Sequence, residues 1–99
     1  MQKQSVRAVA ILKAKSGQER ELLDFALKAM AVVRKVEGLQ KVEISRSFSD
    51  SGQLVLYYWW ETREHSDRYL KGPFYSQIAR GLGELVSERA LVIGEMISG

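Results

Sequence analysis

The sequence predicts an α+β fold in which strands and helices follow one another in the order βαββαβ. Two observations support this prediction. Apolar residues alternate with polar ones in some segments and recur every three or four residues in others, which distinguishes strands from helices. Residues 54–60 read LVLYYWW, so this strand has bulky side chains on both faces. A sheet containing such a strand must be covered on both sides.

The first half of the chain predicts a strand, a helix and a turn into a second strand. Residues 6–14 alternate, and one face of this strand consists of Val6, Ala8, Ala10 and Leu12. Residues 19–36 have a helical apolar stripe, which includes Leu22, Phe25, Ala26, Ala29, Val33 and Val36. Ser16 is expected to cap this helix, and Gly38 is expected to end it.

A hairpin and a short helix are predicted next. The second strand covers residues 39–48, and its apolar residues lie on one face only. The turn SDSG at residues 49–52 joins it to the aromatic strand 54–60. Thr62 is then expected to cap a short helix that reaches Leu70.

A second helix and a last strand complete the chain. Pro73 fits the first position of the helix, whereas Gly81 and Gly83 predict that it ends near Arg80. Residues 90–97 form the fourth strand. The complete order is that of a ferredoxin-like fold with a four-stranded antiparallel sheet and helices on one face. We expect a single domain over residues 1–99.

The aromatic strand also predicts a partner. Helices of the same chain can cover one face of a small sheet, but a chain of 99 residues has little left for the other. We therefore expect a homodimer in which a second subunit covers the face of Trp59. Tryptophan and tyrosine are enriched at such interfaces.

Composition restricts the function further. The net charge of +3 is spread along the chain, which argues against a nucleic-acid partner. Cysteine is absent and His65 is the single histidine, which excludes disulfides, thiol nucleophiles and the usual multi-histidine metal sites. Because the sequence has no membrane span and no signal-peptide core, we expect a cytoplasmic location and no membrane partner.

From Gly38 to Phe74 the sequence resembles the antibiotic biosynthesis monooxygenase (ABM) family of dimeric α/β barrels. The matching segments are EGL, VEISRS, LVLYYWWE and KGPF, and Trp60 is the most specific position. The resemblance implies a ferredoxin-like homodimer that oxygenates a quinol or a polycyclic phenol, a small aromatic molecule, in a pocket between sheet and helices. It implies chemistry without a cofactor or a metal.

Two positions differ from the usual pattern of this family. Tyr58 replaces a common acidic residue, and Tyr69 or Leu70 replaces the usual helix histidine. Haem-degrading members use a histidine to ligate iron and an asparagine on the first strand. This sequence has no asparagine, and His65 lies too close to Trp60. The resemblance therefore does not extend to the haem-degrading branch.

The resemblance makes Trp60, Tyr58 and Tyr69 the candidate catalytic residues. The indole of Trp60 would stack on a flat substrate. The two tyrosines would orient a substrate oxygen by hydrogen bonding, because a phenol with an ordinary pKa near 10 is a poor base at neutral pH. The alternative is that these rings only fill the core.

His65 and Phe74 are the candidate substrate-binding residues. Histidine is suited to acid–base chemistry near neutral pH, but the charged neighbours of His65 also fit a solvated helix position. Phe74 is expected to shape the pocket wall. Arg46 and Arg80 are cations that could hold an anionic substrate group, although nothing in their sequence spacing marks either of them as a binding residue.

Other functions fit the same order of elements, among them an isomerase or hydrolase of a small metabolite. A non-catalytic dimeric module, for ligand binding or structure, needs a cleft but no reactive group. An RNA-recognition module stacks bases on aromatic residues of its first and third strands, whereas strand 6–14 has no aromatic residue. Oxygen uptake with a reduced naphthoquinol or an anthrone separates the oxygenase from the non-catalytic module.

Overall fold

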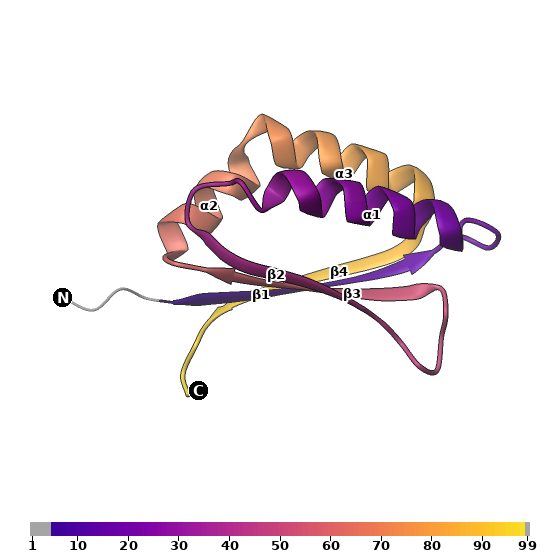
Figure 1. Ribbon diagram of the computed structural model, residues 1–99, viewed down its shortest axis with the longest axis horizontal. Coiled ribbons are helices and arrows are strands. Elements are labelled where there is room, and N and C mark those ends of the chain that lie inside the picture. Colours follow the sequence, from indigo (N-terminus) through magenta and orange to yellow (C-terminus); the bar gives the residue numbers. More distant parts are fainter. Residues whose placement is uncertain (1–4, 99) are drawn as a thin grey trace.

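The computed structural model describes residues 5–98, which form a four-stranded antiparallel sheet with three helices on one face (Figure 1). The elements are β1 (Val6–Ala14), α1 (Glu19–Val33), β2 (Leu39–Arg46), β3 (Gln53–Trp60), α2 (Arg63–Lys71), α3 (Pro73–Leu85) and β4 (Val86–Glu95). The strand order in the sheet is β2-β3-β1-β4. The ferredoxin-like βαββαβ fold predicted from the sequence is confirmed, with two helices, α2 and α3, in its second helical segment.

The main core lies between the sheet and α1. β1 pairs with β3 on one side and with β4 on the other, so that Leu12 is opposite Leu54 and Ala10 is opposite Leu56. The buried stripe of α1 packs onto these strands with its residues at helical spacing: Leu22, Ala26, Met30 and Val33. A smaller cluster around Trp60 continues the core toward α2.

α1 begins at Glu19 as predicted but differs at both caps. Gln18 occupies the N-cap position and no side chain caps the helix, so the cap expected from Ser16 is wrong. The helix also ends at Val33, three residues earlier than predicted. The N–H of Val36 bonds to the carbonyl of Val33, which tightens the last turn and directs the chain back toward β2.

In the second helical segment, α2 and α3, the start agrees with the prediction from the sequence and the end does not. The hydroxyl of Thr62 accepts a hydrogen bond from the N–H of His65 at 3.1 Å, which confirms the predicted cap. α3 continues through both of its glycines, five residues beyond the predicted end at Arg80. Gly81 faces the ring of Phe25 on α1 with no room for a Cβ atom, so the glycine allows the two helices to approach.

The strand ends also differ from the prediction. β2 ends at Arg46 instead of residue 48, and the hairpin loop follows it. β4 begins at Val86, directly after α3, and ends at Glu95, whereas residues 90–97 were predicted. Consequently β4 includes Arg89, which the sequence prediction left outside the strand.

The sheet face away from the helices, called the open face below, is apolar at its centre, on β1, β3 and β4. Ile11 is opposite Val55, and Val9 is opposite both Tyr57 and Val92. Ile11 and Tyr57 are each 37% exposed, and Val92 is 66% exposed. β3 therefore carries apolar and aromatic side chains on both faces, and within residues 5–98 only the face toward the helices is covered (Figure 1).

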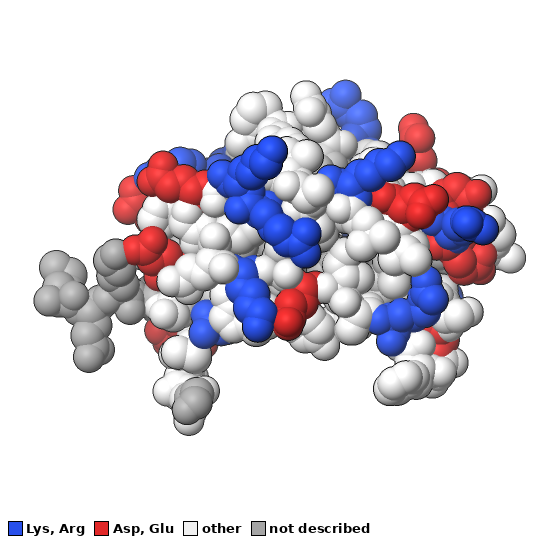
Figure 2. All heavy atoms as spheres, in the orientation of Figure 1, with Lys and Arg blue, Asp and Glu red and all other residues white. Residues whose placement is uncertain are grey.

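Charged side chains are interspersed over the surface. Figure 2 shows Lys and Arg alternating with Asp and Glu across the face in view. On α2 the guanidinium of Arg68 lies 2.9 Å from the carboxylate of Glu64, one helical turn away. Within residues 5–98, each helix is too short or too polar to cross a membrane.

Candidate active site

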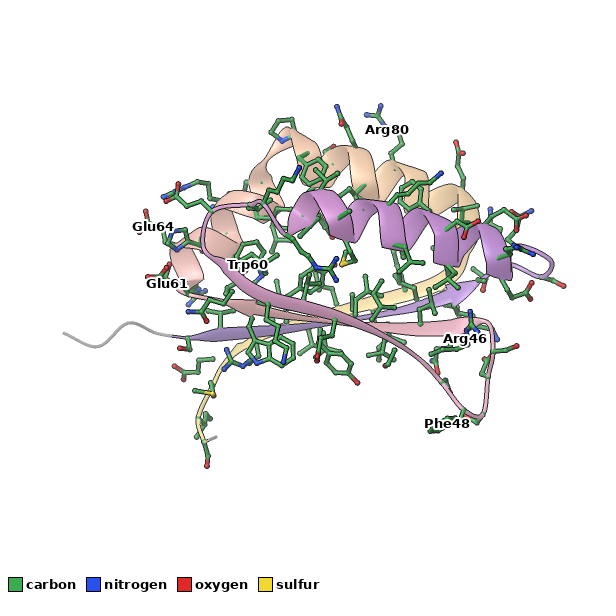
Figure 3. All side chains as sticks on the ribbon, in the orientation of Figure 1. Arg46, Phe48, Trp60, Glu61, Glu64 and Arg80 are labelled. Carbon is green, nitrogen blue, oxygen red and sulfur yellow. The ribbon has the colours of Figure 1, made fainter. Side chains whose placement is uncertain are left out.

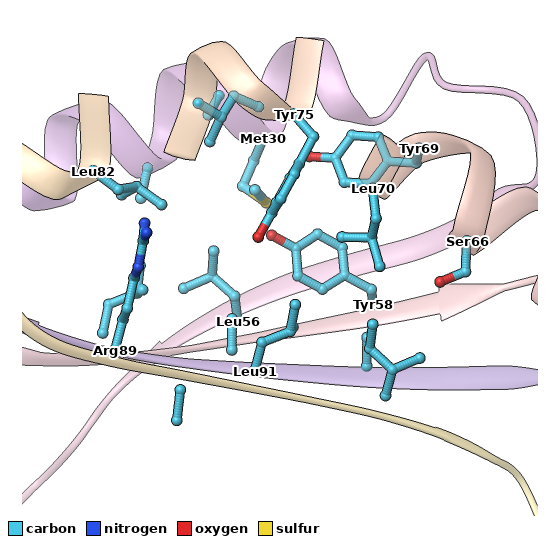
Figure 4. A pocket seen from close by; sticks show the side chains of 18 of the residues that line it. Met30, Leu56, Tyr58, Ser66, Tyr69, Leu70, Tyr75, Leu82, Arg89 and Leu91 are labelled. Atoms are coloured by element: carbon cyan, nitrogen blue, oxygen red, sulfur yellow. The ribbon is translucent and has the colours of Figure 1, made fainter. Parts of the chain in front are cut away.

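A cavity of about 260 Å³ lies between the sheet and the helices (Figure 4). Its floor includes Ala8 and Ala10 of β1, whose methyl groups leave space that a larger side chain would fill. Larger side chains of β3 form one wall, and residues of all three helices close the top. The exposed edge strand β4 completes the lining through Arg89, Ala90, Leu91 and Ile93. The interior is thus mostly apolar, as in many small-molecule sites.

The three candidate catalytic residues line this one cavity. Trp60 is 2% exposed and packs against Val6 and Ala8. Its indole lies 5.2 Å from the ring of Tyr69 between centroids. Tyr58 is two residues before Trp60 on β3 and so shares its face of the sheet. Figure 3 shows Trp60 between the sheet and the helices.

A third tyrosine joins the two that the sequence indicated. The ring of Tyr75 on α3 meets that of Tyr69 edge-on at 5.3 Å between centroids. None of the hydroxyls of Tyr58, Tyr69 and Tyr75 has a hydrogen-bond partner among residues 5–98. Figure 4 shows the hydroxyl ends of Tyr58 and Tyr75 directed toward each other. The three tyrosines therefore supply the cavity with hydroxyl groups that are free to donate hydrogen bonds.

The phenols of Tyr58 and Tyr69 are held neutral. Burial raises the pKa of Tyr58 far above its ordinary value, and the neighbouring phenol of Tyr75 raises it further. Burial likewise raises the pKa of Tyr69, with smaller contributions from Tyr58 and Tyr75. Both groups stay protonated across the neutral range, so they can donate hydrogen bonds but cannot act as bases.

Ser66 of α2 also lines the cavity and was not among the residues predicted from the sequence. It is 1% exposed, and its hydroxyl has no hydrogen-bond partner in the described part of the chain. Ser66 lies three residues before Tyr69, so the two side chains share one face of the helix. This spacing is the sequence signal that could have indicated it.

Arg89 of β4 is the one charged side chain among the described residues that line the cavity. One of its guanidinium nitrogens donates a hydrogen bond to the carbonyl of Ala79 on α3 at 3.1 Å. The sequence instead suggested Arg46 and Arg80 as cations that could hold an anionic group. Arg80 points away from the sheet and Arg46 lies at the hairpin end of β2 (Figure 3), and neither lines the cavity.

His65 and Phe74 lie outside the lining of this cavity, beside a second depression on the outer surface. Nδ1 of His65 is 2.7 Å from Oγ1 of Thr62, and Nε2 is 3.5 Å from a carboxylate oxygen of Glu37. The side chain of His65 is only 18% exposed, so the solvated position suggested by its neighbours is wrong. It is held against the loop that follows α1.

Phe74 packs against the outer side of the cavity wall. Its ring meets the ring of Tyr69 edge-on at 6.3 Å between centroids. Phe74 therefore packs behind a cavity residue and does not face the space itself. Among residues 5–98, no group of three or more histidine and acidic side chains is placed to hold a metal ion.

Residues 5–81 match the family model described as antibiotic biosynthesis monooxygenase. The chain belongs to this family. The resemblance found in the sequence is thus confirmed over most of the ABM protein. The matched region includes Trp60, Tyr58, Tyr69 and Ser66, and it ends before Arg89 on β4. No curated protein matches the sequence.

Solved structures share the fold at low sequence identity. A protein from Deinococcus radiodurans, assigned as an antibiotic biosynthesis monooxygenase, is 18% identical with a TM-score of 0.88, covering 95% of this chain and 94% of that chain. A mutant of SnoaB, a cofactor-independent oxygenase from Streptomyces nogalater, is 14% identical with a TM-score of 0.86, covering 97% and 96%. Rv0793 from Mycobacterium tuberculosis is 19% identical with a TM-score of 0.86, covering 96% and 97%. These likenesses establish the common fold.

Proposed function

We propose that this ABM protein is a cofactor-independent monooxygenase that acts on a quinol or a polycyclic phenol, bound in the cavity between sheet and helices. The observation that carries the proposal is the cavity itself, an apolar space with unpaired phenol donors and one arginine. Membership of the ABM family supports monooxygenase activity at the level of the family. A cytoplasmic location is part of the same proposal.

The substrate supplies the electrons in this reaction. An anthrone illustrates the balance: its methylene carbon loses two hydrogens, one atom of dioxygen becomes the new carbonyl oxygen, and the other leaves as water. The electrons come from the substrate after its enol or phenol has lost a proton. The protein must therefore orient the substrate and stabilise its anion.

The lining residues can provide both effects. The guanidinium of Arg89 favours the anionic form of a nearby substrate oxygen and so makes its deprotonation easier. Tyr58 and Tyr69, which remain neutral, donate hydrogen bonds to substrate oxygens. The indole of Trp60 provides a flat surface for stacking. Because the described lining contains no carboxylate or imidazole, the substrate proton passes to water.

The test is oxygen uptake with an anthrone and with a reduced naphthoquinol, followed by mass spectrometry under ¹⁸O₂. We expect one dioxygen consumed per substrate and one labelled oxygen in the anthraquinone. Arg89→Gln should lower kcat/KM at least about tenfold, equivalent to about 1.4 kcal/mol. Arg80→Gln, a matched change on the outer side of α3, should leave it unchanged. If oxygen uptake is no faster with the protein than without it, the result would support the non-catalytic module instead.

We also propose that the protein works as a homodimer joined through the open face. The support is the apolar centre of that face, on which Val92 is 66% exposed. Trp59 lies on the same face, with Arg7 5.6 Å and Lys41 5.1 Å from its ring. A second subunit would remove this surface from water.

A further inference from the structure

We infer that Ser66 is a substrate-binding residue, which selects aromatic ligands with a second, uncharged oxygen at the end of the ring system farthest from Arg89. This inference rests on the proposed function only in placing the ligand in the cavity. It names a feature of the substrate that the oxygenase chemistry alone does not require. The role of Ser66 is recognition, and the reacting atoms are elsewhere.

The first observation is the unpaired hydroxyl of Ser66. The residue is 1% exposed, lines the cavity, and finds no hydrogen-bond partner among residues 5–98. Buried hydroxyl groups in folded proteins are almost always hydrogen-bonded. An unpaired hydroxyl in the wall of a ligand-sized cavity therefore indicates that its partner belongs to the ligand.

The second observation is the separation of polar groups along the cavity. Figure 4 shows Arg89 at one end and Ser66 at the other, with Leu56, Leu91 and the ring of Tyr58 between them. A ligand that satisfies both ends must carry an oxygen at each, joined by an apolar body. A flat ring system oxygenated at both ends meets this requirement.

The two ends differ in charge. Arg89 favours an oxygen that is anionic or becomes so. Near Ser66 the described lining offers aromatic and apolar side chains and no cation, so an anionic oxygen there would be buried without compensation. A serine hydroxyl both donates and accepts hydrogen bonds. The oxygen at this end is therefore a neutral hydroxyl or carbonyl.

The size of the cavity limits the ring system. Ligand cavities have volumes of about 300–1,000 Å³, and this cavity has about 260 Å³. A bicyclic or compact tricyclic body matches such a space better than a tetracyclic one. The simplest probe is a naphthalene with an oxygen on each ring.

A matched pair of ligands tests the inference by isothermal titration calorimetry. 2,6-Dihydroxynaphthalene has a hydroxyl at each end, whereas 2-naphthol has only one. One net neutral hydrogen bond corresponds to about fivefold in affinity. We expect Ser66→Ala to weaken binding of the diol by about that factor and to change binding of 2-naphthol less than twofold.

Ser76→Ala is the matched control, since it makes the same change at an exposed position of α3. It should alter neither affinity. A second measurement uses the protein without ligand. Because Ser66→Ala removes an unpaired buried hydroxyl, its Tm should equal or exceed that of the wild type. A lowered Tm would show that the hydroxyl already has a structural partner and would overturn the inference.

The binding data also separate this inference from the proposed oxygenase activity. Equal weakening of both ligands by Ser66→Ala, equal affinity of the wild type for the two, or no binding of either would overturn the role of Ser66. None of these results depends on turnover. If Ser66→Ala weakens binding of the diol selectively and no oxygen uptake is detected, the role of Ser66 is supported and the oxygenase proposal is refuted.

Discussion

Trp60 is buried because three neighbours enclose its indole. It pairs with Val6 on β1, packs on Ala8, and faces the ring of Tyr69 at 5.2 Å. Removing the indole would leave a large void in a region where the chain has little freedom to collapse. The side chain is thus part of the core and part of the cavity wall at once.

Trp60→Ala should lower the free energy of unfolding by about 3–5 kcal/mol, as is usual for a buried tryptophan. Urea unfolding followed by circular dichroism measures this. Trp60→Phe retains an aromatic ring at the site and is expected to lose less than half as much. A Trp60→Ala protein as stable as the wild type would show that the indole is not part of the core.

The buried tyrosines predict a loss of stability in alkali. In the unfolded chain a phenol ionises near pH 10, whereas burial raises the pKa of Tyr58 and Tyr69 in the folded state. The folded protein therefore keeps these protons above pH 10 while the unfolded chain releases them. Their contribution to stability is complete below pH 10 and falls as the pH rises further.

We expect the free energy of unfolding to fall between pH 10 and pH 12, by at most about 1.4 kcal/mol per pH unit for each tyrosine. Urea titrations at pH 9, 10 and 11 measure the slope, and Tyr58→Phe should reduce it. Equal slopes in the wild type and Tyr58→Phe would contradict the prediction.

Those residues of the candidate site that follow a simple strand or helix periodicity could be predicted from the sequence. Alternation along β3 places Tyr58 and Trp60 on one face, and both line the cavity. Ser66 and Tyr69 share a face of α2 by helical spacing, although only Tyr69 was recognised. Arg89 was missed because the start of β4 depends on where α3 ends, which is decided by packing.

At the scale of elements, Gly38 connects α1 to β2 at a crowded point. Its φ of +87° lies in the left-handed region, and a Cβ atom there would overlap the imidazole of His65 on α2. The glycine thus serves two purposes, since it turns the chain and allows the N-terminus of α2 to pack on the loop. The sequence indicates the first of these but not the second.

Gly38→Ala should be clearly more destabilising than Gly17→Ala, because the two sites share the backbone strain but not the crowding. Gly17 has a φ of +83° with open space around it, so alanine there should cost only about 1–2 kcal/mol. Thermal melting of both variants measures the difference. If both lost the same stability, the contact between Gly38 and His65 would have no energetic significance.

The end of α3 is also decided between elements. Local propensity predicts that Gly81 and Gly83 stop the helix, yet it continues to Leu85. At Gly81 the absence of a side chain lets α3 lie close against Phe25 of α1. Packing between the helices outweighs the weak propensity of the glycines, and single-sequence periodicity contains no information about that contact.

At the scale of the whole molecule, the open face makes a prediction about assembly. Light scattering at micromolar concentration should give twice the chain mass of 11.2 kDa. Val92→Glu should shift the mass toward 11.2 kDa, because a carboxylate would have to be buried in the interface. Val32→Glu makes the same change on the outer side of α1, where Val32 is 50% exposed, and should leave the mass unchanged. A wild type of 11.2 kDa would refute the proposed dimer.

By itself the sequence determined the order of the elements, the two apolar faces of β3 and the family. Those features depend on local periodicity and on side-chain identity, which are present in any single chain. Only the tertiary structure decided that Ala8 and Ala10 leave a cavity, that Ser66 and Arg89 lie at its two ends, and that His65 and Phe74 lie outside it. Cavities and contacts between distant segments arise from the way helices pack on a sheet, so no local pattern encodes them.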